Sequence, residues 1–163
     1  MKSALGITHL ALQVVKTRPM NCTIMRPSAI ALARRTSSSA VPFVDALVLE
    51  YVEIARGLRE GDSPVALMAL CRANERLERF LHFLYVASDV VAGSSVPSRN
   101  LVHKYRVRVL EIVDRMEAIL EQMDFDGLAF LIERGIADTL RQYKSLANEV
   151  EWALGDRVQA QAA

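Results

Sequence analysis

Four side chains that can bind metal ions recur at one-turn spacing near the middle of the chain. Cys71, Glu75, Glu78 and His82 stand at positions i, i+4, i+7 and i+11 of a predicted helix, so they share about 60° of arc. Thiolate, carboxylate and imidazole groups are ligands for transition metals. The arc lies far from the apolar side of the same helix, however, so we expect it to face solvent. A metal-dependent bundle enzyme that uses Glu75, Glu78 and His82 is the alternative interpretation, and no cofactor is predicted.

Signatures of other enzyme classes are missing from the sequence. It contains no Gly-x-Ser-x-Gly elbow, no known Cys–His protease pattern and no glycine-rich loop that could hold phosphates. Ser63 and Ser98 are explained as helix caps. The arginines of the second predicted helix stand beside carboxylates such as Glu75 and Glu78. The sequence therefore predicts a protein without catalytic activity and without a specific nucleic-acid partner.

The length and composition are those of one globular domain. The chain has 163 residues, of which 52% are hydrophobic and 24% charged, and its net charge is +1. Two cysteines exclude a disulfide scaffold. No apolar run approaches the roughly 18 residues that a membrane-spanning helix needs, so no membrane span is expected.

The first 42 residues differ in charge from the rest of the chain. They contain six lysines and arginines and no acid, so the remainder is net negative. This segment, which is also rich in Ser and Thr, is predicted to be disordered, to be a targeting sequence, or to reflect translation that begins later, at Met20 or Met25. The expected location is the cytoplasm. If residues 1–35 are a transit peptide, the location is instead an organelle matrix.

Residues that typically begin or end helices divide the remaining chain into four predicted helices. The first runs from near Pro42 to Glu60, where Gly61 ends it, and the second begins with Ser63 as its N-cap and continues to residue 93. The third begins after the cap Ser98. The fourth is capped by Asp124 or Asp126 and runs to residue 154, with a close backbone contact expected at Gly135.

These helices predict an all-α, up-down antiparallel four-helix bundle over residues 43–155, followed by a disordered tail at 156–163. The third helix has the most regular apolar repeat. Its stripe is Tyr105, Val109, Ile112, Met116, Ile119 and Met123.

The first helix has an unusually wide apolar side, which spans about 180°, whereas one neighbouring helix covers only about 100°. Two interpretations follow. The helix packs against two neighbours of its own chain, or part of this side binds an amphipathic helix of another chain or a second copy in a homodimer. The predicted partner-binding residues are Phe43, Val44, Leu47, Val48, Tyr51, Ile54 and Leu58.

Two short segments resemble a known family. The stretch 55–62, which ends in Gly61-Asp62, and the turn 123–128 are similar to the corresponding turns of four-helix flagellin-export chaperones. The linker Ser94–Pro97 and the lone Tyr105 depart from that family's Gly-Gly linker and paired tyrosines. The resemblance implies a cytoplasmic bacterial protein that binds the helix-forming end of an export substrate along apolar grooves, with residues 1–42 as a cap over the groove.

Overall fold

The computed structural model describes residues 27–92 and 96–160, and within them the fold is all-α, as predicted. The described residues are helical apart from short turns at 60–62, 122–124 and 142. The elements are α2 (Pro27–Arg59), α3 (Ser63–Ala92), α4 (Val96–Glu121), α5 (Phe125–Leu131), the π-helical segment η1 (Ile132–Ala137), α6 (Asp138–Arg141) and α7 (Tyr143–Ala160).

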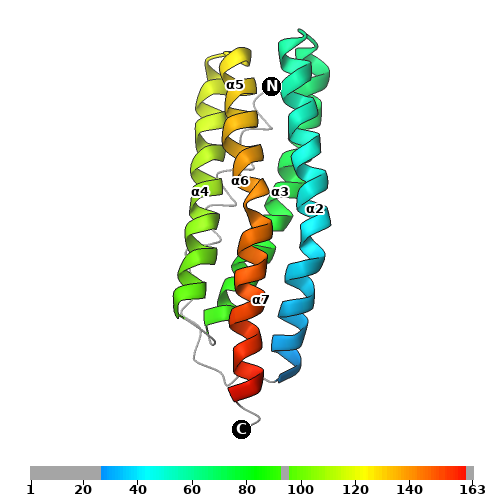
Figure 1. The fold of residues 1–163 in the computed structure, drawn as a ribbon. Helices are drawn as coiled ribbons and strands as arrows, with labels where there is room; N and C mark the ends of the chain where they lie inside the picture. Colours follow the sequence, from blue (N-terminus) through cyan, green and yellow to red (C-terminus); the bar gives the residue numbers. More distant parts are fainter. Residues whose placement is uncertain (1–26, 93–95, 161–163) are drawn as a thin grey trace.

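The long helices lie side by side along one axis, and α5 to α7 together form the last column of the fold (Figure 1). Helices α2 and α3 run in opposite directions, because Tyr51 contacts Asn74 while Phe43, earlier in α2, contacts Phe80, later in α3. Large side chains fill the centre between the columns. The largest fully buried ones are Leu47, Tyr51, Leu77, Leu84, Leu128, Ile132, Ile136 and Leu140.

Helix α2 ends at Arg59, one residue before the predicted end, and Gly61 lies in the turn that follows, as predicted. This glycine has a positive φ of 85°, which favours a residue without Cβ. The amide of Asp62 donates to the carbonyl oxygen of Gly57 at 3.0 Å, and that of Gly61 donates to Leu58 at 3.4 Å. These two bonds satisfy the last carbonyl groups of the helix.

Helix α4 ends in the same hydrogen-bond pattern with a less suitable residue. Met123 takes the left-handed position, with φ of 56°, and it is exposed rather than part of the apolar stripe. Its placement in the predicted stripe is therefore wrong, because the helix has already ended at Glu121. Asp124 then caps α5 as predicted: its carboxylate accepts a hydrogen bond from the amide of Gly127 at 2.9 Å.

Three predicted boundaries are wrong. Helix α4 begins at Val96, so Ser98 lies inside it and is not its N-cap. Helix α2 begins at Pro27, so Pro42 lies inside it, and residues 27–42 are not separate from the first helix. Packing explains the extension, because Ser37 is buried and its carbonyl oxygen accepts a hydrogen bond from the Tyr143 hydroxyl. At the other end α7 runs through Gly155 to Ala160, past the predicted limit of 155 and into the predicted tail. The expectations for residues 1–26 concern a segment outside the described residues.

The π-helical segment η1 interrupts the last column at Gly135, the glycine that was expected to pack closely. Gly135 lies in η1, and a Cβ added there would stand 3.1 Å from a methyl carbon of Ile112 in α4 and 2.8 Å from one of Leu131. Close packing at Gly135 is confirmed, but the atoms that approach it belong to side chains and not to another backbone. The π-helical turn and the missing side chain bring this column against α4.

Candidate interaction surface

The metal-binding column predicted from the sequence lies on the surface of α3. Cys71, Glu75, Glu78 and His82 are all exposed. Among the residues that the structure describes, no group of three or more His, Cys, Asp or Glu side chains is arranged to hold a metal ion. Within the described part of the chain, the predicted residues Glu75, Glu78 and His82 therefore do not form a metal site.

The predicted partner-binding face of α2 lies inside the chain's own core. Six of its residues are at most 6% exposed, and Phe43 is half-buried. The prediction that this face is open to another chain is therefore wrong in this structure. The six buried residues are Val44, Leu47, Val48, Tyr51, Ile54 and Leu58. The cause is the first of the two interpretations: α2 packs against α3 on one flank and against the column α5–α7 on the other.

The flank of α2 that meets α3 combines apolar packing with partly buried polar contacts. The hydroxyl of Tyr51 donates to Oδ1 of Asn74 at 2.8 Å. Arg76 donates to Glu50 at 2.6 Å, and its guanidinium also lies 5.3 Å from the centre of the Phe43 ring. Burial raises the pKa of Tyr51 well above its ordinary value, because the ionised form would lose its hydration.

The other flank of α2 is fixed at its end by an ion pair. Arg59 donates two hydrogen bonds to Glu133 of η1, at 2.5 and 2.7 Å. The hydrogen bond from Arg59 lowers the pKa of Glu133 below its ordinary value of 4.5, since it favours the charged carboxylate. This exposed pair connects residues 74 positions apart and joins the end of α2 to η1.

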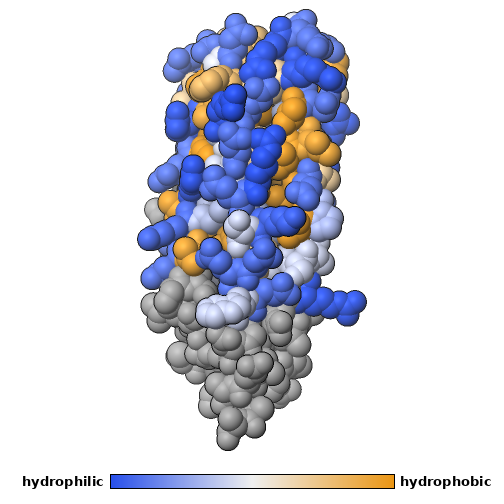
Figure 2. All heavy atoms as spheres, in the orientation of Figure 1, coloured by the Kyte–Doolittle hydropathy of each residue, from blue (hydrophilic) through white to orange (hydrophobic). Residues whose placement is uncertain are grey.

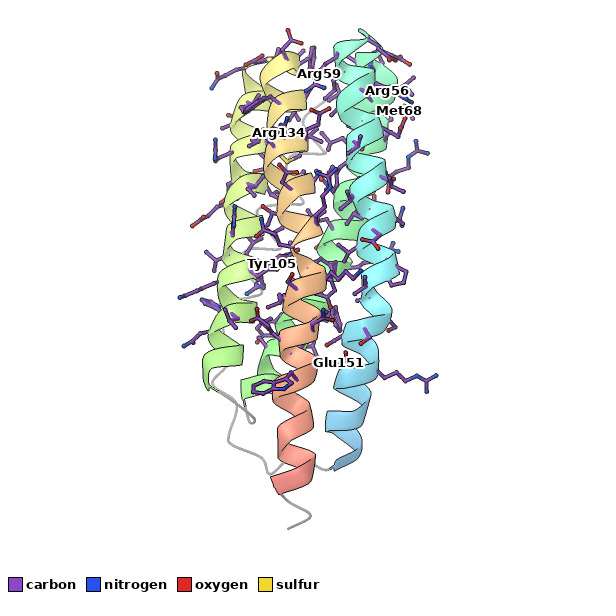
Figure 3. The ribbon with its side chains drawn as sticks, viewed as in Figure 1. Arg56, Arg59, Met68, Tyr105, Arg134 and Glu151 are labelled. Atoms are coloured by element: carbon purple, nitrogen blue, oxygen red, sulfur yellow. The ribbon has the colours of Figure 1, made fainter. Side chains whose placement is uncertain are left out.

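A tyrosine of α4 lies against the last column with its hydroxyl buried. Tyr105 is buried, and its ring centre lies 6.1 Å from that of Tyr143. Figure 3 shows it among the helices rather than at the surface. Its hydroxyl oxygen is buried without a partner among the described residues. Burial raises the pKa of Tyr105, as it does for Tyr143, whose hydroxyl donates to Ser37 at 3.2 Å.

Helix α3 carries an exposed row of side chains that includes apolar residues, and this row was not predicted from the sequence. Seven exposed residues follow the heptad spacing of 3, 4, 3, 4, 3 and 4 positions, so they share one side of the helix. We call this set the outer stripe of α3: Val65, Met68, Arg72, Glu75, Arg79, His82 and Val86. The heptad spacing of this row can be seen in the sequence. The predicted metal-binding column shares only Glu75 and His82 with it.

Apolar residues occupy both ends of the outer stripe, and charged residues occupy its middle. Val65, Met68 and Val86 are 58%, 67% and 47% exposed. Figure 3 places Met68 at the outer edge of the fold, at the same end as Arg56. Neither Arg72 nor Arg79 forms an ion pair with any residue that the structure describes.

Other exposed apolar side chains lie on several elements. Leu49 is 67% exposed on the outside of α2, and Figure 2 shows a hydrophobic patch over the upper part of α2 and smaller ones on the opposite side of the view. Phe130 and Trp152 are exposed on α5 and α7. Single exposed apolar residues are common on soluble proteins, so the outer stripe of α3 is distinguished by having several on one line.

In the described part of the chain, no helix combines the length and the apolar character that crossing a membrane requires. No protein-family model matches the chain, and no curated protein or solved structure is significantly similar to it.

Proposed function

We propose that the chain is a non-enzymatic, up-down four-helix bundle that binds an amphipathic helix of another protein along the outer stripe of α3. The observation that carries this proposal is the heptad-spaced row of exposed side chains with apolar residues at both ends. A helix laid along such a row buries side chains at the same spacing on its own surface. The proposal moves the partner site from α2, where the apolar face is already occupied, to α3.

The charged residues of the stripe indicate which charges the partner helix carries. Arg72 and Arg79 lie between the apolar ends, and neither has a carboxylate partner within the described residues. Glu75 lies between these two arginines, so the complementary helix carries acidic residues that face Arg72 and Arg79, and apolar residues farther out on either side. The resemblance to flagellin-export chaperones supports the same kind of partner, namely the helix-forming end of another chain, and a cytoplasmic location.

A binding titration tests this proposal. The probe is a labelled synthetic helix of about six turns, with leucines at both ends of one side and glutamates at the centre of that side. We expect the full chain to bind it, Met68→Lys to weaken binding by about tenfold, and Arg72→Glu to weaken it similarly at low salt. Lys144→Glu, an exposed charge reversal on α7, is the control and is expected to change nothing. Equal binding by Met68→Lys and the wild type would overturn the proposal.

A further inference from the structure

The charges of α4 change sign halfway along the helix. From Val96 to Leu110 the sequence has no acid, and its described cations are Lys104, Arg106 and Arg108, with His103 beside them. From Glu111 to Glu121 it has four acids and one arginine. One helix therefore carries a basic half and an acidic half in sequence.

Both halves contribute to one outward side of α4. Seven residues follow the heptad spacing along it, and all are exposed except Val107, which is half-buried. We call this set the outer face of α4: Asn100, Lys104, Val107, Glu111, Asp114, Ala118 and Glu121. Among the described residues, Lys104, Glu111 and Asp114 take part in no ion pair, so their charges are open to another molecule.

We propose that the outer face of α4 is the contact surface for a second copy of this chain, with the two α4 helices antiparallel. A two-fold axis relates identical surfaces, so each residue i that meets j also has j meeting i. With the axis midway between Lys104 and Asp114, Lys104 of each copy faces Asp114 of the other. Glu111 then faces Val107, beside the basic half of the other copy.

The charge pattern selects the antiparallel arrangement. In a parallel pair Lys104 would face Lys104 and Asp114 would face Asp114, and like charges across a contact oppose association. The antiparallel pair instead brings each basic half against an acidic half. This argument uses α4 alone and does not depend on the proposed binding of a helix to α3.

Mainly polar contacts imply that the association is weak and sensitive to salt. Val107 and Ala118 are the only apolar residues of the face, and exposed ion pairs are screened as ionic strength rises. We expect concentration-dependent dimerisation of the full chain in low salt and its loss at about 1 M salt, where the screening length is only about 3 Å.

Sedimentation equilibrium of charge-reversal variants tests the pairing. Lys104→Glu places two acids opposite each other, and Asp114→Lys places two lysines opposite each other, so each variant alone is expected to weaken dimerisation by about tenfold or more. A mixture of the two variants restores both attractive pairs. We therefore expect the mixture, and also the double variant, to dimerise as the wild type does.

Measuring dimerisation and binding of the synthetic helix on the same variants separates this inference from the proposed function. Arg72→Glu on α3 should leave dimerisation unchanged while it weakens binding of the synthetic helix, and Lys104→Glu should do the reverse. Both positions are exposed, so unchanged circular dichroism is the check on folding. A wild type that stays monomeric in low salt, or a mixture that fails to restore dimerisation, would overturn the α4 pairing.

Discussion

The inner face of α2 and the outer stripe of α3 are both regular rows of side chains, but only the first is covered by the chain itself. The α2 face is wide because two flanks are covered, by α3 and by the column α5–α7. The stripe on α3 is narrower and less apolar, yet all seven of its residues are exposed. An apolar arc thus indicates how many neighbours a helix has, whereas a docking surface is shown by residues that remain exposed after those neighbours are in place.

Truncating one residue of each row gives the largest expected contrast. Leu47 is 0% exposed, so Leu47→Ala should destabilise the chain by about 2–5 kcal/mol through lost burial and the cavity that remains. Met68→Ala should change stability by about 0.5 kcal/mol or less, because that side chain is mostly in solvent. Urea unfolding measures both changes. Leu49→Ala, on the exposed side of α2, is the control for residue type and should behave like Met68→Ala. A similar loss at Leu47 and Met68 would show that the α3 stripe is also covered.

The sequence predicted which side of each helix is apolar and where most turns fall, because both signals are local. Leu47 and Leu58 were recognised from helical periodicity, and Gly61 from its position after the first helix. It did not predict how many neighbours α2 has. Contacts such as Arg59 with Glu133 join residues far apart in sequence, and no local pattern specifies them.

Local signals were also misleading where packing overrides them. Pro42 is a helix breaker by its missing amide hydrogen, yet α2 continues through it because Ser37, farther toward the N-terminus, is packed against α7. The candidate site on α3 was missed for a related reason. The spacing of Val65, Met68 and Val86 was readable, but their exposure depends on where the other helices lie.

Removing single hydroxyl groups tests the α3 flank of α2 with smaller effects. Tyr51→Phe deletes the donor to Asn74 and should destabilise the chain by about 1–2 kcal/mol, since a partly buried acceptor loses its partner. Tyr105→Phe is the matched variant. It removes a hydroxyl that has no partner among the residues placed in the structure, so we expect it to be neutral or to stabilise by up to about 1 kcal/mol. Urea unfolding again compares the two, and equal losses would mean that the hydrogen bond to Asn74 does not hold this flank.

The smallest expected effect concerns the other flank of α2, where Arg59 pairs with Glu133. The pKa of Glu133 is lower in the folded chain than in the unfolded one, so the pair contributes stability above the ordinary carboxyl value of 4.5. That contribution is lost as the pH falls through the depressed pKa, because the folded chain must then bind the proton too. Glu133→Gln should therefore be slightly less stable than the wild type at neutral pH, and the difference should disappear in acid. Unfolding by urea at a series of pH values measures this difference.

Glu149→Gln is the control, because Glu149 is an exposed carboxylate on α7 without an ion pair among the described residues. A stability difference for Glu133→Gln that stays constant with pH would contradict this prediction. It would show that the charge of the Glu133 carboxylate does not stabilise the contact between η1 and α2, and that apolar packing alone does.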